Sequence, residues 1–379
     1  MSTYLVVDLA NLFQRIRHVV GGDAETKVGM TLHTVFQSLR KLYTGQKCDH
    51  IVLCLEGKSW RYDIYPEYKA ARRLKQAQAR IDDPEGDDLF FATLDTFVTF
   101  MREKTRVTVL QKHGVEGDDF IARWTQLHPD DKHIILSGDT DFIQLLSDNV
   151  SIYDGVNNRL ITPQGIFDEK NEPMVFRVDG GSGKLKVGLT VAKAREAHKR
   201  AQREEAAEAR KEGREYTATE FVFEIEPEWW KKALFIKIIR GDVSDSIFSA
   251  YPRVQYTSKS KVGISEAWGD RHNRGYLWNN FMLSEWDKAI GMDEEGKPIK
   301  KSVSVRDEFS MNETLIDLTK QPQSVKDVMD AVIVEAVQKK TAGNVGIYLL
   351  KFCAKYELNN VARDCNDHAA YLNAPYSRD

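Results

Sequence analysis

Five short acidic patches recur along this chain, and four of them follow segments expected to be strands. Asp8 ends the run YLVVD, Glu56 ends HIVLCLE, and Asp139 follows HIILSG. A carboxylate at the end of a buried strand costs free energy unless a cation meets it. Hard divalent metal ions prefer oxygen ligands, so the patches indicate a metal site. The patches are Asp8, Glu56, Glu116-Gly117-Asp118-Asp119, Asp139-Thr140-Asp141 and Asp242-Val243-Ser244-Asp245.

Each patch also has an ordinary structural interpretation. A lone aspartate at position 139 would more often be a helix N-cap, although the run SGDTD after a buried strand favours metal binding. Glu116 and Asp119 share a helix face at spacing i,i+3, and acids in a first helical turn are favoured by the helix dipole. Asp242 and Asp245 follow Gly241, a usual helix-end residue, and fit a solvated turn equally well.

A basic stretch interleaved with aromatic residues follows the second acidic patch. Cations and aromatic rings together suit a phosphate backbone and stacked bases. The alternative is an exposed helix with ordinary basic residues, and the aromatic density favours nucleic acid. The stretch comprises Lys58, Trp60, Arg61, Tyr62, Tyr65, Tyr68, Lys69, Arg72, Arg73, Lys75 and Arg80.

Other motifs argue against several classes of site. GGSGKL at 180–185 fails the phosphate-loop pattern at both ends, so a turn is expected there. The nine histidines show no HExxH spacing, and the four cysteines form no CxxC pair. Zinc binding, a disulfide framework and a nucleophilic hydrolase are therefore not expected.

Bulk composition indicates a globular protein of 379 residues, with 42% hydrophobic and 29% charged residues. The net charge of −3 alone argues weakly against nucleic acid, but acidic and basic regions are segregated along the chain. No apolar run approaches membrane-spanning length, and no basic segment precedes the first strand, so neither a membrane span nor a signal peptide is expected. The cysteine pattern fits a reducing cytoplasm, and a monomer is expected.

Strands and helices alternate over residues 1–165, which predicts an α/β fold with a mostly parallel central sheet flanked by helices. Function in such sheets gathers beyond the carboxyl ends of the strands. Strands are expected at 4–9, 50–56, 106–111, 132–138 and 150–155, and helices at 30–43, 66–81, 88–104, 117–127 and 140–146.

The rest of the chain divides in two. Residues 166–227 are expected to hold a β-hairpin around the Gly-rich turn and a charged helix at 191–216, interpreted as a solvated insertion rather than a backbone-binding arm. Residues 228–379 are expected to form a mainly helical domain.

The motifs IYPEYKAAR, VEGDDFIA, LSGDTDF and KIIRGDVSD together resemble the 5′-nuclease (flap endonuclease) family. The likeness is nearest to the ribonuclease H branch of T-even bacteriophages, a 5′→3′ exonuclease, and extends to the 5′-nuclease domain of bacterial DNA polymerase I. It covers about 4–155 and 230–248, is fainter near 312–322 and 347–356, and is missing over 166–227. It implies a PIN-like nuclease domain over 1–165 and a degenerate helix–hairpin–helix region within 228–379.

The resemblance implies two Mg²⁺ positions, with Mn²⁺ as a substitute. The first would be built by Asp8, Glu56, Glu116, Asp118 and Asp139. Asp119, Asp141, Asp242 and Asp245 would serve the second, or hold it through waters. Lys69 and Arg72 would act at the scissile phosphate, with Asp118 and Asp139 as the other catalytic residues. Nucleic acid would be bound by Arg61, Tyr68, Lys69, Arg72, Arg73, Lys237, Lys259 and Lys261.

Two departures from the family matter. Position 56 is Glu where the family usually has Asp, so its metal contact is direct or through water. The segment AYPRVQYTSKSKVGISEAW lacks the family's Gly-x-Gly-Ile-Gly run, although Lys259, Lys261 and Gly263 remain candidates to hold a duplex and a potassium ion.

The expected activity is two-metal hydrolysis of phosphodiesters at 5′ ends or flaps of DNA and RNA–DNA duplexes, as in primer removal during phage replication. Single-strand-binding protein and a clamp are expected partners of such an enzyme. Two alternatives stay open: a PIN-like ribonuclease, and a non-catalytic protein that binds DNA of particular structure.

Overall fold

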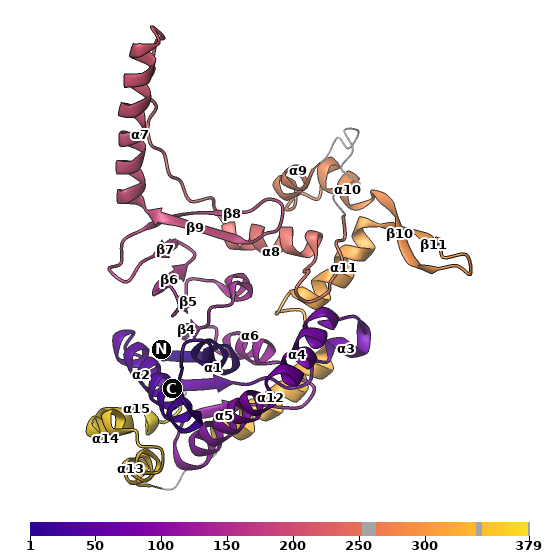
Figure 1. Cartoon of the computed structure of the whole chain (residues 1–379). Coiled ribbons are helices and arrows are strands. Elements are labelled where there is room, and N and C mark those ends of the chain that lie inside the picture. The colour runs from indigo at the N-terminus through magenta and orange to yellow at the C-terminus, as the bar shows by residue number, and fades with distance from the viewer. Residues whose placement is uncertain (252–262, 339–342, 378–379) are drawn as a thin grey trace.

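A seven-stranded sheet forms the centre of the computed structural model, which describes residues 1–251, 263–338 and 343–377. The strands lie in the order β3-β2-β1-β4-β5-β6-β7, and the first five of the chain are parallel (Figure 1). Their order places β1 and β4 at the middle, with Val7 opposite Leu53 and Leu136. The strands are β1 (Thr3–Asp8), β2 (His50–Cys54), β3 (Thr108–Leu110), β4 (Lys132–Leu136), β5 (Val150–Asp154), β6 (Arg159–Thr162) and β7 (Gly165–Phe167).

The five predicted strands and the α/β fold class are confirmed. β6 and β7 were not predicted, and they extend one edge of the sheet in antiparallel fashion. Because a hairpin needs a short turn rather than a crossover helix, β5, β6 and β7 follow one another directly along the chain.

Helices cover both faces of the sheet, as a buried parallel sheet requires. Two apolar clusters result, one on each side of β1, with alternate residues such as Leu5 and Val6 pointing into opposite clusters. The helices of this part are α1 (Leu9–Arg17), α2 (Ala24–Gly45), α3 (Arg61–Ile64), α4 (Ala70–Asp82), α5 (Pro84–Lys104) and α6 (Gly117–Leu127), with the 3-10 helix η1 (Thr140–Leu145).

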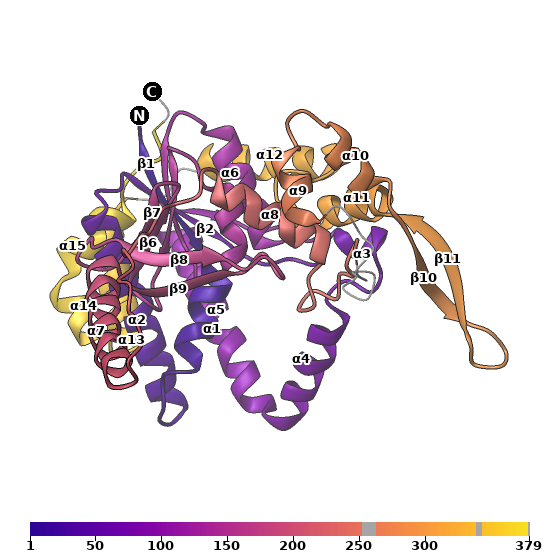
Figure 2. The same cartoon turned by 90° about the horizontal axis from the view of Figure 1, so that it is seen from above.

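The four longer predicted helices are confirmed as α2, α4, α5 and α6. The fifth, expected at 140–146, forms the 3-10 turn η1 instead. Figure 2 shows α4 and the start of α5 as an arch that stands away from the sheet, whereas later residues of α5 are buried in the core. No residue of α4 is buried, which leaves its cations facing solvent.

The predicted hairpin is present as β8 (Met174–Val178) and β9 (Leu185–Thr190), with the Gly-rich segment as its turn. The charged helix α7 (Val191–Lys211) projects from the body of the molecule, and Ala209 is its one buried residue (Figure 1). Residues 212–226 return along α7, where the side chain of His198 lies 3.0 Å from the carbonyl oxygen of Thr219.

The remaining chain is mainly helical, with one exposed hairpin, β10–β11, that was not predicted. Its elements are α8 (Trp229–Arg240), α9 (Ile264–Gly269), α10 (Tyr276–Met282), β10 (Glu285–Met292), β11 (Pro298–Ser304), α11 (Val305–Ile316), α12 (Gln323–Gln338), α13 (Val345–Lys355), α14 (Asn359–Arg363) and α15 (Cys365–Leu372). Lys259 and Lys261 lie outside the described residues.

The last helices return to the sheet rather than staying with α8–α11. Leu349 on α13 and Leu372 on α15 are fully buried in the cluster that also holds Leu5 and Phe36. Met329 on α12 is buried in the opposite cluster. The three-domain division remains a prediction, but the packing shows that the core around the central sheet draws on residues from both ends of the chain.

Candidate active site

Asp8 and Asp139 end neighbouring parallel strands and are linked through one hydroxyl group. Ser137 Oγ donates a hydrogen bond of 2.8 Å to Asp8 Oδ2 and accepts one of 3.0 Å from the backbone amide of Asp139. Asp8 also caps α1 by accepting from Asn11, and Asp139 caps η1 by accepting from the amide of Asp141. Each carboxylate therefore has both a capping role and a position at the sheet edge, so the capping interpretation does not exclude a ligand role.

The carboxylates at this edge repel one another. Burial raises the pKa of Asp118 well above its usual value, and the negative charges of Glu56, Asp8 and Asp139 raise it further. Burial and then the charge of Asp141 raises the pKa of Asp139 to about 6. Removal of the Glu56 carboxyl from water, with repulsion by Glu116 and Asp8, raises its pKa to about 7, although Lys69 opposes the shift. Such a site lowers its free energy when it takes up protons or a cation.

A second group of carboxylates already holds a cation. Lys237 Nζ lies 2.5 Å from Asp141 Oδ1 and 2.7 Å from Asp242 Oδ2, across 96 residues of sequence for the first pair. The pKa of Asp242 is lowered to about 2, since the charge of Lys237 and bonds from Ser244 outweigh the effect of burial. The sequence-predicted residues Asp141, Asp242 and Lys237 thus come together, with an ammonium group between the two carboxylates.

The turn that carries Asp242 depends on Gly241, which ends α8 with φ of +71°. A Cβ at this position would lie 2.4 Å from the carbonyl oxygen of Ile247. The amide and carbonyl of Asp242 pair with those of Ile247 at 3.0 and 2.8 Å, which closes the turn. Only glycine fits so close a backbone approach at positive φ.

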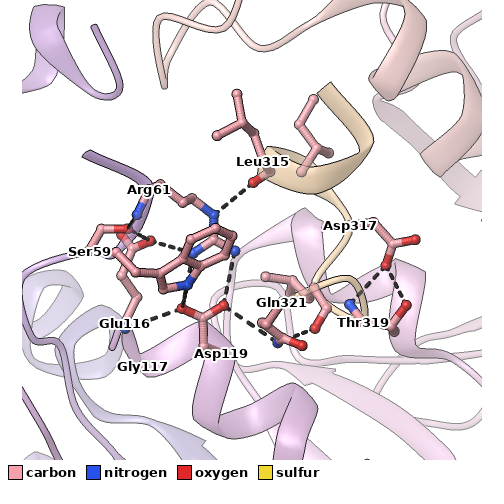
Figure 3. Close-up of polar contacts among 12 residues, drawn as sticks. Ser59, Arg61, Glu116, Gly117, Asp119, Leu315, Asp317, Thr319 and Gln321 are labelled. Atoms are coloured by element: carbon pink, nitrogen blue, oxygen red, sulfur yellow. Dashed lines mark hydrogen bonds and ion pairs between the residues drawn. The ribbon is translucent and has the colours of Figure 1, made fainter. Parts of the chain in front are cut away.

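Asp119 and Arg61 correct two predictions. Arg61 donates from Nη2 to Asp119 Oδ1 at 2.9 Å and from Nη1 to Glu116 Oε2 at 2.8 Å, and its Nε donates to the carbonyl oxygen of Leu315 (Figure 3). Trp60 Nε1 donates to Asp119 Oδ2 at 3.0 Å. Asp119 is fully buried and Arg61 is 1% exposed. Asp119 is therefore not positioned as a direct metal ligand, and the guanidinium of Arg61 is turned to Asp119 and Glu116 rather than to nucleic acid, because the charges neutralise each other inside the protein.

Glu116 stands between this buried ion pair and the cleft. Its Oε1 accepts from Lys69 Nζ at 2.5 Å, while Oε2 accepts from Ser59, Arg61 and Tyr68. These cations lower the pKa of Glu116 despite its burial. Glu116 is thus ionised and positioned at the cleft, but its oxygens are already bonded.

The start of α4 forms one wall of the cleft. Tyr68 is 4% exposed and packs against Ile238 and Ile247, and its contact with nucleic acid stays a prediction. Lys69 has φ of +54°, a costly conformation for a residue other than glycine that is often found at functional sites. Arg72 lines the cleft and donates no hydrogen bond within the described chain, whereas Arg73 lies over the ring of Tyr62.

The cleft between these walls has a volume of about 650 Å³. Asp118, Asp139, Asp141, Asp242 and Asp245 all line it, together with Lys69, Arg72 and Lys237. A narrower recess of about 20 Å³, lined by Glu116, Asp118, Asp141, Asp242 and Asp245, leads off it and has room for one water molecule or ion.

The donor chemistry of these residues fits a hard divalent cation, because every candidate ligand is a carboxylate oxygen. Within the described part of the chain, however, no three acidic, histidine or cysteine side chains already form a ready-made metal shell. Lys69 and Lys237 bond to Glu116, Asp141 and Asp242, so a metal ion at the second position would have to replace an ammonium group.

Several site residues were not predicted. Ser59 and Ser137 orient Glu116 and Asp8, and Leu315 anchors Arg61 from α11. Ser182 and Lys184 of the β8–β9 turn also line the cleft. A serine two residues before Asp139 was visible in the sequence, but the contact from Leu315 required the fold.

The family described as 5′-3′ exonuclease, N-terminal resolvase-like domain, matches residues 3–171. This span contains β1–β7 and the carboxylates from Asp8 to Asp141. Residues 3–171 are thus similar to this nuclease family. Over these residues the match agrees with the resemblance that the sequence motifs carried.

Curated relatives named as flap endonucleases match a similar length of the chain. Flap endonuclease Xni of Psychromonas ingrahamii is 30% identical over 178 residues, covering 44% of this chain and 62% of that protein. The flap endonuclease of Escherichia phage T5 is 31% identical over 170 residues, covering 44% of this chain and 56% of that protein. The chain thus spans less than two thirds of the length of these relatives.

Solved 5′-nuclease structures share the fold over more of the chain. The T5 D15 protein co-crystallised with metal ions has a TM-score of 0.51 at 18% identity, over 88% of this chain and 99% of that one. T5 5′-exonuclease with bound zinc has a TM-score of 0.52 at 17% identity, over 88% of this chain and 99% of that one. The likeness therefore extends beyond the family domain into the helical region. Among the described residues, no helix is both long and apolar enough to cross a membrane.

Proposed function

We propose that this protein is a structure-specific 5′ nuclease that hydrolyses phosphodiesters at 5′ ends or flaps. The observation that carries the proposal is the composition of the cleft. Carboxylates from strand ends and from the Asp242–Asp245 turn form its floor, and cations of α4 form one wall. A phosphate backbone needs the cations, and metal-assisted hydrolysis needs the carboxylates. The names of the relatives, flap endonuclease and 5′-exonuclease, support the same activity.

Divalent ions, Mg²⁺ or Mn²⁺, would supply an activated water and stabilise the leaving oxygen when bound. Asp8, Glu56, Asp118 and Asp139 would hold one ion, since their raised pKa values reflect an unmet negative charge. Asp141, Asp242 and Asp245 would hold the second once Lys237 moves aside. Solved relatives bound to divalent metal ions support the metal requirement.

The cations have separate tasks in this proposal. Lys69, held at Glu116, offers an ammonium group at the cleft for the phosphoryl oxygens. Arg72 has an unbonded guanidinium on the first exposed turn of α4, which suits a bidentate contact with phosphate. Lys237, released from Asp141 and Asp242, would carry its charge toward the incoming backbone.

The substrates are proposed to be DNA and RNA–DNA duplexes with 5′ ends or flaps, which suits RNA primer removal in replication. One relative structure holds DNA and metal ions in a pseudo-enzyme–product complex, which supports a DNA substrate. RNase H activity, a potassium ion in the C-terminal region, a monomeric state and contacts with single-strand-binding protein or a clamp belong to the same proposal.

The test is cleavage of 5′-labelled flap, nicked-duplex and RNA–DNA substrates with Mg²⁺. The wild-type protein should cleave the flap, and Asp139→Asn and Asp141→Asn should each reduce the rate at least about hundredfold. Lys170→Ala is the control. Lys170 is exposed and precedes β8, whereas the turn that lines the cleft follows the other end of that strand. Full cleavage by both aspartate variants would refute the carboxylate assignment. Binding without turnover by the wild type would favour the non-catalytic alternative, and cleavage of single-stranded RNA alone would favour a PIN-like ribonuclease.

A further inference from the structure

The turn between β8 and β9 reaches the cleft from the side opposite α4. Ser182, Gly183 and Lys184 line the same cavity as Lys69, Arg72 and Lys75. Figure 1 shows the end of the hairpin lying beside α8, the helix that carries Lys237. This turn lies beyond residue 171, outside the part of the chain that matches the nuclease family.

The side-chain carboxylate and the backbone carbonyl of Asp179 fix the conformation of the turn. Asp179 Oδ1 accepts from the amide of Gly181 and the hydroxyl of Ser182, each at 3.0 Å, and its Oδ2 pairs with Lys186. Its backbone carbonyl accepts from the amides of Ser182 and Gly183 at 3.2 and 2.7 Å. A turn fixed by five such contacts places the backbone of its next residue, Lys184, at a defined position beside the cleft.

Gly183 docks the turn on the active-site helix. It has φ of +70°, and an added Cβ would lie 2.5 Å from the carbonyl oxygen of Ala233 and 2.9 Å from the amide of Lys237. The contact therefore falls on the residue whose side chain bridges Asp141 and Asp242. Gly180, in the same turn, has no atom within 4 Å of a built Cβ. The tight approach is specific to position 183.

Lys184 is exposed, and its ammonium makes no hydrogen bond or ion pair with the described residues, whereas the neighbouring Lys186 is paired with Asp179. An unpaired cation on a rigid turn at the mouth of a cleft favours an anionic ligand. Arg72 on the opposite wall is likewise unbonded, so a strand between them would meet a cation on each side.

We propose that the β8–β9 turn is a second phosphate-binding wall and that Lys184 contacts the sugar–phosphate backbone of the strand entering the cleft. This inference rests on the proposed nuclease function and adds a positioning residue to it. Lys184 lies on a different element from the carboxylates and has no contact with them, so it sets the position of the strand rather than taking part in hydrolysis.

The test compares Lys184→Ala with Lys170→Ala, which removes an exposed charge near the other end of β8. Binding of a fluorescent 5′-flap DNA is measured by anisotropy in EDTA over a series of salt concentrations. Lys184→Ala should weaken binding several-fold and reduce the slope of log K against log salt by about 0.7 to 0.9, the effect of one lost phosphate contact. Lys184→Arg should restore both quantities. With Mg²⁺, KM should rise in Lys184→Ala while kcat changes little.

A second pair of variants tests the docking of the turn. Gly183→Ala should weaken binding as Lys184→Ala does, because the turn must move away from α8, whereas Gly180→Ala should behave as wild type. If Lys184→Ala and Lys170→Ala share the wild-type affinity and salt slope, the turn is a solvated connection and the inference is wrong. If the wild-type protein neither binds nor cleaves the flap, the proposed function fails instead.

Discussion

The backbone amide of Lys69 donates a hydrogen bond of 2.8 Å to the carbonyl oxygen of Asp245. Ala71 and Tyr65 make further contacts with Ser246, at 3.2 and 3.3 Å. These bonds join the start of α4 to the turn after α8. The cations at the start of α4 and the carboxylates Asp242 and Asp245 therefore form one structural unit. The left-handed backbone of Lys69 is held in place by this contact.

The buried Arg61–Asp119 pair makes a stability prediction. Arg61→Ala should lower the free energy of unfolding by about 3–5 kcal/mol, because Asp119 and Glu116 would remain buried without their cation. Arg200→Ala, which removes an exposed pair with Glu204 on α7, should change it by less than about 0.5 kcal/mol. Urea denaturation measures both. A loss below about 1 kcal/mol in Arg61→Ala would mean that the pair is not needed for folding.

A substitution at Gly241 tests whether the turn with Asp242 and Asp245 belongs to the site. Gly241→Ala should destabilise the protein by about 1–3 kcal/mol and reduce flap cleavage at least tenfold, because the turn bearing Asp242 must shift. Gly213 is the matched control, since its φ of +68° is similar but a Cβ there would meet no atom within 4 Å. Gly213→Ala should cost about 1 kcal/mol and leave cleavage unchanged. Equal activity of the two variants would show that the turn is not part of the site.

Lys237 makes a prediction about metal affinity. Lys237→Met removes the ammonium group between Asp141 and Asp242, so Mn²⁺ should bind about tenfold more tightly, which corresponds to about 1.4 kcal/mol. The control is Lys231→Met on the same helix, where the exposed lysine pairs with half-buried Glu228. Isothermal titration calorimetry without DNA measures the affinity. Unchanged or weaker binding in Lys237→Met would mean that Lys237 does not compete with the metal.

The raised pKa of Asp139, about 6, predicts how the free energy of unfolding depends on pH. Between pH 4 and 7 the folded protein retains a proton there that the unfolded chain has lost, so this residue's contribution to stability falls as pH rises. Asp139→Asn should therefore gain stability relative to wild type over this range, on the order of 2 kcal/mol after allowance for solvent screening.

Measuring the difference between the two proteins cancels other titrations in the same range. Buried His50, His133 and His368, with pKa lowered to about 4, act in the opposite direction in both. Asp242, with pKa of about 2, loses its contribution only below pH 4. Metal-free protein in EDTA is required, and a pH-independent difference would show that Asp139 is not crowded by other carboxylates.

Local pattern was sufficient for the five parallel strands, the longer helices of the sheet domain and the Gly-rich hairpin. Hydrophobic runs such as YLVVD and HIVLC predict buried strands from the local sequence alone. A parallel sheet then brings the carboxyl ends of these strands to one edge. The convergence of Asp8, Asp118 and Asp139 followed from that rule. The strands β6, β7, β10 and β11 escaped prediction because hairpins at an edge or in solvent carry a weaker hydrophobic signal.

The sequence by itself determined the sheet, the family domain and the set of carboxylates, because these depend on residue type and on contacts near in sequence. The tertiary structure decided which carboxylates face the cleft. Asp118 and Asp119 are neighbours in sequence, yet one lines the cavity and the other is buried against Arg61. The surroundings of the two side chains differ because adjacent helical residues point about 100° apart. The residues they contact come from elements far away along the chain. The same holds for Lys184, whose position at the cleft depends on how a hairpin packs on α8.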